Sequence, residues 1–291
     1  MKVVILIGSP TAPLIYFTNA IHRHHKVELV IVEKVNESKL KLINTKKKQI
    51  LESHVPLLVA FIDKVFKYVL FKINIYKKTR MKKEEELKYA EACQKWFKDS
   101  YKSIDLTIPF LEVEDINSSI VQEALMKINP DLLLDHGTSL VKPAVLKLAK
   151  QALNLHWGLS PYYRGSNCTV QALMNWDIYN IGVTIHKLAV QIDGGDILAQ
   201  SRATISSDDT LRTIPLQLTY LGTEIVKSTI DKLKRKENIQ FIKQNFNDGF
   251  LVREMYWDEN TSLFIDNLNK EKMELMLKKP SRQAAPIVQI D

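Results

Sequence analysis

The sequence predicts an α/β fold with a mostly parallel sheet, because strand-like and helical patterns alternate along most of its 291 residues. The run KVVILIG at 2–8 is continuously apolar, as expected for a parallel strand that is buried on both faces. A helix from Pro13 to about His25 separates it from a second apolar run, VELVIVEK at 27–34. Strand, helix and strand in so short a stretch indicate a βαβ unit, whose two strands lie parallel.

The alternation resumes after residue 104 and supplies the rest of the sheet. We expect strands at 105–117, 129–137, 152–158, 180–190 and 193–200, helices from about Ser118 and at 142–151, a longer helix at about 208–236, and a weakly patterned end at 245–291. The predicted organisation is a core domain over 1–204 with a small C-terminal extension over 205–291.

Residues 36–102 contain one Pro and no Gly, which predicts a helical insertion in the core domain. Apolar side chains recur at helical spacing over 57–71, and 82–97 reads as a further helix. Thirteen Lys or Arg lie between Lys39 and Lys83 against two acids, so this segment carries a net charge of +11 and the rest of the chain −3. Its basic, amphipathic character fits contact with tRNA phosphates or a membrane surface, a homodimer contact, or a solvated helical hairpin against the sheet.

Cysteine content and hydropathy favour a cytoplasmic protein. The two cysteines, Cys93 and Cys168, are too few and too far apart to indicate a disulfide framework or a zinc site. The N-terminal apolar run is short and ends at Gly8, so it reads as a strand and not as a signal peptide. No run approaches the roughly 18 apolar residues that a membrane-spanning helix needs.

The stretch NLHWGLSPYYRG at 154–165 is the first candidate for a functional site. Asn154 and His156 are two residues apart on a predicted strand, so both side chains point to the same face. The chain then turns, and ligands of α/β proteins usually bind where strands run out into such turns. A core His beside a turn Asn is the alternative interpretation.

Three stretches together resemble the N10-formyltetrahydrofolate-dependent formyltransferases in order and spacing. They are NPDLLLDHGTSLVKPAVL at 129–146, NLHWGLSPYYRG at 154–165 and IGVTIHKLAVQIDGGDILAQ at 181–200. The resemblance covers 103–202 closely and 1–34 by fold only. It implies a Rossmann-like formyltransferase core with N10-formyltetrahydrofolate as co-substrate, and no metal.

The resemblance assigns catalysis to Asn154, His156 and Asp193, the last of which follows His156 by 37 residues. Transfer of a formyl group passes through a tetrahedral oxyanion, which the amide of Asn154 and an N–H of His156 would stabilise. His156 would also move protons, because its ordinary pKa lies near neutrality, and Asp193 would orient the ring. Asp196 competes with Asp193 for the carboxylate role, and His186 reads as a packed strand residue.

The same resemblance places the pterin ring of the folate in a cleft lined by 136–142 and 190–193. The expected folate contacts are His136, Leu140, Val141, Ile192 and Gly194. Trp157 and Arg164 are expected to contact the substrate, although each reads equally well as a structural residue. Trp157 stands where many relatives have Pro or Ala.

The core with a modest extension resembles most closely the sugar N-formyltransferases, which implies as substrate the primary amine of a nucleotide-linked amino sugar in polysaccharide biosynthesis. The alternatives are an enzyme like methionyl-tRNA or glycinamide ribonucleotide formyltransferase, and a binding module on a catalytically inactive fold. The presence of Asn154, His156 and Asp193 together argues against the inactive module.

Overall fold

The structure is a computed structural model that describes residues 1–34, 83–252 and 259–289. The amphipathic stripe predicted at 57–71 lies outside these ranges, and so does nearly all of the basic segment 39–83. The contacts expected of that segment, with tRNA, a membrane surface or a second copy, therefore stay predictions.

The chain divides into two compact units, one that joins 1–34 to 93–291 and one of 35–92. The first unit holds the whole central sheet. The second is described only from residue 83, where the chain is helical as far as residue 97. This agrees with the helix expected at 82–97. The predicted division into a core and an extension after residue 204 stays a prediction.

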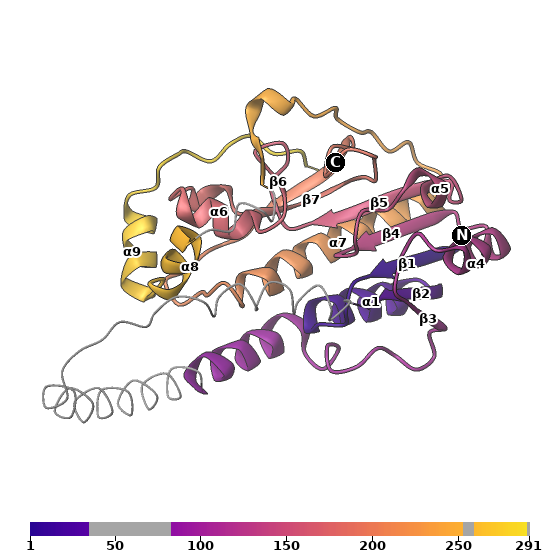
Figure 1. Ribbon diagram of the computed structural model, residues 1–291, viewed down its shortest axis with the longest axis horizontal. Coiled ribbons are helices and arrows are strands. Elements are labelled where there is room, and N and C mark those ends of the chain that lie inside the picture. Colours follow the sequence, from indigo (N-terminus) through magenta and orange to yellow (C-terminus); the bar gives the residue numbers. More distant parts are fainter. Residues whose placement is uncertain (35–82, 253–258, 290–291) are drawn as a thin grey trace, which may run out of the picture. The chain divides into compact units, whose positions relative to one another are not determined.

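Seven strands form the central sheet, in the order β3-β2-β1-β4-β5-β7-β8 (Figure 1). The strands are β1 Val3–Ile7, β2 Val27–Glu33, β3 Phe110–Val113, β4 Leu132–His136, β5 Gln151–His156, β7 Gly182–Lys187 and β8 Ile197–Arg202. The five strands from β3 to β5 are parallel, and β7 and β8 are antiparallel additions. The mostly parallel sheet predicted from the sequence is confirmed.

Helices cover both faces of this sheet (Figure 1). They are α1 Ala12–His24, α4 Ser119–Ile128, α5 Pro143–Leu146, α6 Cys168–Met174, α7 Ile214–Lys234, α8 Glu259–Asp266 and α9 Lys270–Lys278, with 3-10 turns η1 Ile178–Asn180 and η2 Phe246–Asp248. α1 and α7 pack together on one face, and α4 and α5 on the other. Within the described ranges, no helix combines the length and apolar character needed to cross a bilayer.

The two hydrophobic cores follow from alternation along the strands. All five residues of β1 are fully buried, because their side chains point alternately to the two helical layers. Ile5 packs in the core beneath α1 and α7, whereas Leu6 packs in the core beneath α4 and α5. The continuously apolar strand runs in the sequence are the direct cause of this double burial.

Several elements differ from the sequence prediction; the helix expected at 142–151, for example, is only α5 Pro143–Leu146. The strand expected at 105–117 is shortened to β3, because Asp105 Oδ1 accepts hydrogen bonds from the N–H and the hydroxyl of Thr107 and turns the chain before the strand begins. The weakly patterned end contains α8 and α9 as well as β9 Phe250–Val252, which pairs in parallel with β6 Tyr163–Gly165.

The strand order places a topological switch point between β1 and β4. From β1 the chain proceeds to β2 on one side, and it later returns to β4 on the other side. Ligands of open α/β sheets bind in the crevice at the carboxyl ends of the strands at such a point. A ligand-binding site is therefore expected at the carboxyl ends of β4 and β5.

Candidate active site

Three polar side chains form a row across β4, β5 and β7. The strand register sets Asp135 opposite Asn154 and Asn154 opposite His186. All three are buried, with exposed fractions of 6%, 9% and 1%. Since paired residues on adjacent strands point to the same face, these three side chains form a buried polar row on one face of the sheet. Buried polar groups of this kind are kept only where they find partners or a function.

Asp193, in the loop between β7 and β8, joins the two residues of the Asn-x-His motif. Its Oδ1 accepts a hydrogen bond from Asn154 Nδ2 at 3.2 Å and lies 3.4 Å from His186 Nε2. Its Oδ2 lies 3.4 Å from His156 Nδ1 and accepts the backbone N–H of Gly165 at 2.7 Å. The three residues predicted to be catalytic are thus brought together, with His186 as a fourth member.

These contacts keep the Asp193 carboxyl ionised. Burial by itself raises its pKa, but the charges of His156 and His186 and the hydrogen bonds from His186 and the Gly165 N–H outweigh burial and hold the pKa below its ordinary value. Asp196, the competing carboxylate, pairs instead with Lys187 at 3.4 Å, and its side chain is 41% exposed. The geometry therefore supports Asp193 over Asp196.

Both ring nitrogens of His156 lie near hydrogen-bond acceptors. Nδ1 faces Asp193, and Nε2 lies 3.1 Å from the carbonyl oxygen of Tyr163 and 3.6 Å from Cys168 Sγ. Burial lowers the pKa of His156, and the Asp193 charge opposes this effect. Burial also raises the pKa of the Cys168 thiol, so this sulfur is a poor nucleophile. The ring is held firmly between the carboxylate and the turn after β5.

That turn is rigid because a polar network fixes its backbone. Ser160 N–H donates to Thr184 Oγ1 at 3.0 Å, and the Thr184 hydroxyl donates to the carbonyl of Gly158 at 2.6 Å. Gln200 Nε2 donates to the carbonyl of Ser160 at 2.6 Å. A side chain at Gly158 would overlap with His156 Nε2, so glycine is required for the ring to lie where it does.

The region after α7 braces the Asp193 loop from outside. Gln244 is buried, and its Nε2 donates to the carbonyls of Asp193 at 2.8 Å and Gly195 at 2.6 Å. β9 pairs with β6, whose Gly165 binds the carboxylate. The sequence analysis did not identify Gln244, because no local pattern predicts its contact with Asp193, 51 residues earlier in the chain.

The two predicted substrate residues lie near the cluster but are held by protein contacts. Arg164 is buried, and its guanidinium carbon stands 4.2 Å from the centre of the Phe246 ring, while its Nε and Nη1 have no hydrogen-bond partner. Trp157 is half-buried, and its Nε1 donates to Thr219 Oγ1 at 3.1 Å. The Arg164 side chain therefore keeps donors that an anionic ligand would satisfy.

The predicted folate contacts occupy different environments. Leu140 and Ile192 are exposed by 51% and 40%, and Gly194 is half-buried, so all three are available to a ligand. Val141 is buried in the core beneath α4 and α5, which leaves only its backbone for such a contact.

His136 lies apart from the polar row. Its ring packs edge-on against Phe17 and Trp157, within the layer of α1. Burial lowers its pKa to about 3, so the ring is neutral, and its Nε2 has no hydrogen-bond partner. The structure does not bring the His136 side chain together with Asn154 and His156.

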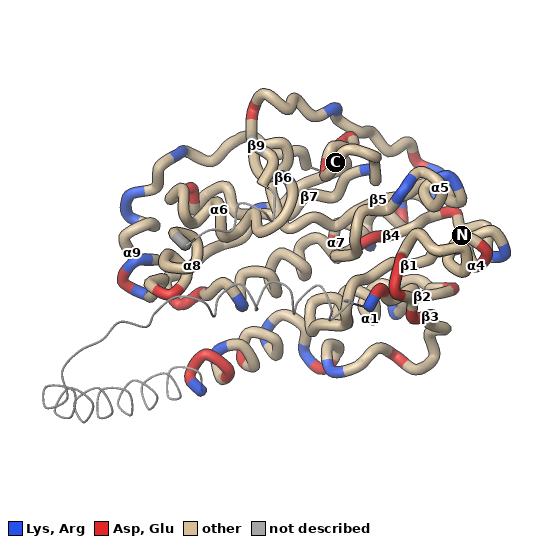
Figure 2. Tube along the Cα trace, viewed as in Figure 1, with Lys and Arg blue, Asp and Glu red and all other residues tan. Residues whose placement is uncertain are grey.

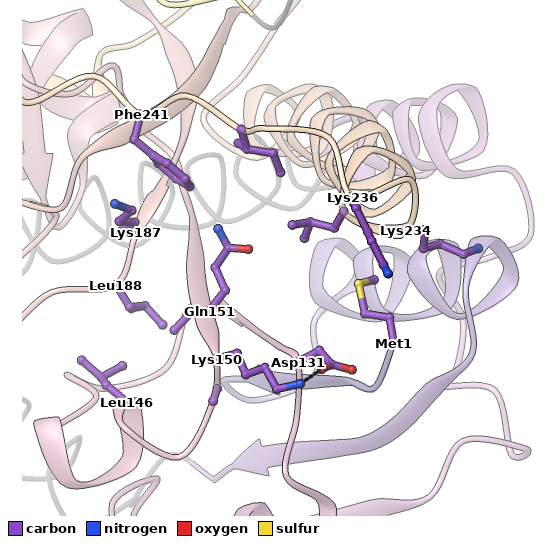
Figure 3. A pocket seen from close by; sticks show the side chains of 14 residues that line it. Met1, Asp131, Leu146, Lys150, Gln151, Lys187, Leu188, Lys234, Lys236 and Phe241 are labelled. Carbon is purple, nitrogen blue, oxygen red and sulfur yellow. Dashed lines mark hydrogen bonds and ion pairs between the residues drawn. The ribbon is translucent and has the colours of Figure 1, made fainter.

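An open cavity of about 1050 Å³ lies elsewhere, at the amino end of β5 (Figure 3). Figure 3 shows Lys150 joined to Asp131, with Gln151 and Lys187 on the same wall. Lys142 lies just before α5, and Lys147 and Lys150 lie between α5 and β5, where Figure 2 shows basic segments. None of Asn154, His156 and Asp193 lines this cavity. The candidate active site is defined instead by the contacts of Asp193 with Asn154 and His156.

The Formyl transferase family profile matches residues 73–230, and the chain belongs to that family. Among curated proteins, methionyl-tRNA formyltransferase of Buchnera aphidicola is 28% identical over 178 residues, which cover 60% of this chain and 55% of that protein. The corresponding protein of Lactobacillus gasseri is 30% identical over 183 residues, with 62% and 54% covered. The chain thus spans about half the length of the curated relatives it matches.

Solved structures show the same fold. A sugar N-formyltransferase from a Shewanella species superposes with a TM-score of 0.52 at 15% identity and covers 99% of this chain and 96% of its own. Glycinamide ribonucleotide transformylase 1 from Symbiobacterium toebii gives 0.51 at 14% identity, with 84% and 94% covered. The sugar 3N-formyltransferase WlaRD, solved with dTDP and 5-N-formyl-THF, gives 0.50 at 15% identity, with 88% and 71% covered.

Proposed function

We propose that this protein transfers the formyl group of N10-formyltetrahydrofolate to the primary amine of an amino sugar, which is carried on a nucleotide. The observation that carries the proposal is the buried cluster in which Asp193 contacts both Asn154 and His156. It lies at the carboxyl ends of the strands, beside the switch point, in a chain that belongs to the formyl transferase family.

The cluster supplies what formyl transfer requires. The amine attacks the formyl carbon, and the carbonyl oxygen gains negative charge. The Asn154 amide and a His156 N–H donate hydrogen bonds to that oxygen in a site from which most water is excluded. One of the two Asn154 contacts, with Asp193 or with His186 Nε2, is exchanged for the oxyanion. Asp193 stays ionised and supports positive charge on His156, which moves the proton from the amine towards N10.

The neighbouring residues fit a ligand that extends from this cluster. Leu140, Ile192 and Gly194 offer exposed apolar and backbone surface for the pterin ring. Arg164, with two unpaired donors, would bind an anionic part of the substrate, such as a phosphate. WlaRD was solved with a folate compound and with a nucleotide, which supports the same pair of ligand classes for this chain.

The choice of an amino sugar rests on the extent of the structural likeness. A sugar N-formyltransferase matches nearly the whole chain, including the part after α7 that braces Asp193. Methionyl-tRNA is the second candidate acceptor, because the curated sequence relatives act on it by name. That match covers only about half of each relative.

The test measures tetrahydrofolate release from N10-formyltetrahydrofolate with a panel of amines: dTDP- and UDP-linked 3- and 4-amino sugars, glycinamide ribonucleotide and methionyl-tRNA. We expect turnover with one amino sugar, its loss in His156→Ala, and full rate in His25→Ala, a histidine remote from the cluster. Turnover with methionyl-tRNA alone would favour the second candidate. Folate binding without turnover on any amine would contradict formyl transfer.

A further inference from the structure

Asp135 has a buried carboxyl group that takes no part in the formyl transfer proposed for Asn154, His156 and Asp193. It lies near the carboxyl end of β4, opposite Leu6 of β1 on one side and Asn154 of β5 on the other. It therefore stands at the switch point itself, one strand from the amide that would hold the formyl oxygen. Adjacent strands lie about 4.8 Å apart, so the Asp135 and Asn154 side chains extend into the same space.

The hydrogen bonding of Asp135 leaves one oxygen open. Its Oδ1 accepts the hydroxyl of Thr138 at 2.6 Å. The hydrogen bonds found among the described residues leave its Oδ2 without a donor, and the residue is 6% exposed. A carboxyl group in this position gains a partner when a ligand with an N–H or O–H enters the site.

The other proton acceptors of the cluster are already committed. Asp193 is contacted through both oxygens, by Asn154, His186, His156 and the Gly165 N–H. His156 lies between Asp193 and the Tyr163 carbonyl. An incoming amine must displace one of these contacts to give its proton to either residue. Oδ2 of Asp135 accepts a proton without such an exchange.

The electrostatic surroundings of Asp135 suit a proton acceptor that works near neutral pH. Burial raises its pKa to about 7; the Thr138 hydrogen bond opposes this, the charges of Asp193 and of Glu33 on β2 add to it, and His186 on β7 lowers it. Asp193 has its pKa held low. Two carboxyl groups whose surroundings push their pKa values apart are the usual sign of different roles in acid–base chemistry.

We propose that Asp135 is a catalytic residue that accepts the proton of the attacking amine, which deepens the formyl transfer proposed above and rests on it. The amine nitrogen forms a bond to the formyl carbon, and the C=O electron pair moves onto oxygen. Asp135 takes the excess proton from that nitrogen. When the carbonyl re-forms, the bond from carbon to N10 breaks, and N10 receives the proton from Asp135.

This step balances without another reactant. One N–H bond of the amine is lost, one N–H bond forms at N10, and Asp135 ends as it began. His156 and Asn154 then serve mainly as donors to the oxyanion. Proton transfer is then carried by Asp135, and His156 keeps only its part in stabilising the oxyanion.

The test compares wild type with Asp135→Asn, Thr138→Val and a matched control, Asp131→Asn, from just before the start of the same strand. With the amine that wild type formylates, Asp135→Asn should lower kcat by about 100-fold or more with little change in KM, and binding of the folate should be unchanged. The fall in wild-type kcat/KM on the acid side of about pH 7 should disappear in this variant.

Thr138→Val separates proton transfer from a structural role. Loss of the hydroxyl removes a hydrogen bond that lowers the Asp135 pKa, so the acid limb of the profile should move to higher pH. Asp131→Asn should leave both rate and profile as in wild type.

The outcomes distinguish the inference from the function on which it rests. A wild-type rate in Asp135→Asn, or a reduced rate with an unchanged pH profile, would overturn the inference and leave formyl transfer standing. Absence of turnover by wild type on every amine would overturn the proposed function, and the inference with it.

Discussion

Asp193 in the β7–β8 loop and Asp135 at the end of β4 are residues of the same type within one polar cluster, and little of either is exposed. Their hydrogen bonds differ. Asp193 is contacted through both oxygens and by two histidines, whereas Asp135 has one hydroxyl donor. The pKa of Asp193 is held low and that of Asp135 is raised to about 7. Burial raises the pKa of both groups, but at Asp193 the histidine charges and hydrogen bonds outweigh it, whereas at Asp135 burial prevails.

The comparison separates two tasks. A carboxylate that is always ionised orients and supports His156, and a carboxyl group that titrates near neutrality exchanges protons. Four predictions test this division, beginning with the largest expected effect.

Asp193→Asn should lower kcat/KM by about 10³–10⁴-fold, because the His156 ring loses the charge that orients it. The measurement is the steady-state rate of tetrahydrofolate release. Asp196→Asn, three residues along the same loop, is the matched control and should change the rate less than twofold. Equal losses in the two variants would show that loop integrity matters and not the Asp193 charge.

Asp135 should make stability depend on pH. A carboxyl group with a folded pKa of about 7 keeps its proton at pH values where the unfolded chain has lost it, so the free energy of unfolding falls as pH rises from about 4 to 7. Between pH 5 and pH 7.5, wild type should lose about 2–3 kcal/mol relative to Asp135→Asn. Urea denaturation of both proteins at several pH values measures this. A constant difference would mean that Asp135 does not titrate in this range.

Gly158→Ala tests whether the position of the His156 ring, which Asp193 contacts, matters for catalysis. The added methyl group would overlap with His156 Nε2 and lie 2.7 Å from the Tyr163 carbonyl oxygen. We expect a loss of about 1–3 kcal/mol in the free energy of unfolding, with a fall in kcat, because the ring must move. Thermal denaturation and rates are measured together. Wild-type values for both would show that the turn accommodates the methyl group.

Gln244→Ala tests the brace on the Asp193 loop. It removes hydrogen bonds to two backbone carbonyls, each worth about 1 kcal/mol. The loop should open more often, which hydrogen exchange of the amides of 190–196 reports, and kcat/KM should fall modestly. Unchanged exchange in this segment would show that Gln244 does not stabilise the Asp193 loop.

The sequence predicts the sheet well because strands that are buried on both faces appear in it as continuous apolar runs. Asn154 and His156 could be found by their spacing of two on a strand, and Asp193 by the resemblance to the family. Asp135 was not among the expected site residues, because nothing local shows that it lies beside Asn154. That relation depends on the register between β4 and β5.

His186 and Gln244 show the same limit. His186 reads from the sequence as a packed strand residue, and its contact with Asp193 arises from a loop that folds back over β7. Gln244 reaches the loop because Ile242 pairs with Ile197 at the start of β8, and β9 pairs with β6 further along the chain. Side chains that act through long-range pairing carry no periodic or motif signal.

The central claim, formyl transfer by the cluster of Asn154, His156 and Asp193, is tested most directly by following the transferred carbon. N10-formyltetrahydrofolate labelled with carbon-13 in the formyl group is incubated with the protein and a nucleotide-linked amino sugar, and the sugar is analysed by mass spectrometry and NMR. We predict a labelled formamide on the sugar nitrogen with wild type and none with His156→Ala. Labelled formate with an unmodified sugar, or equal labelling by both proteins, would contradict the account.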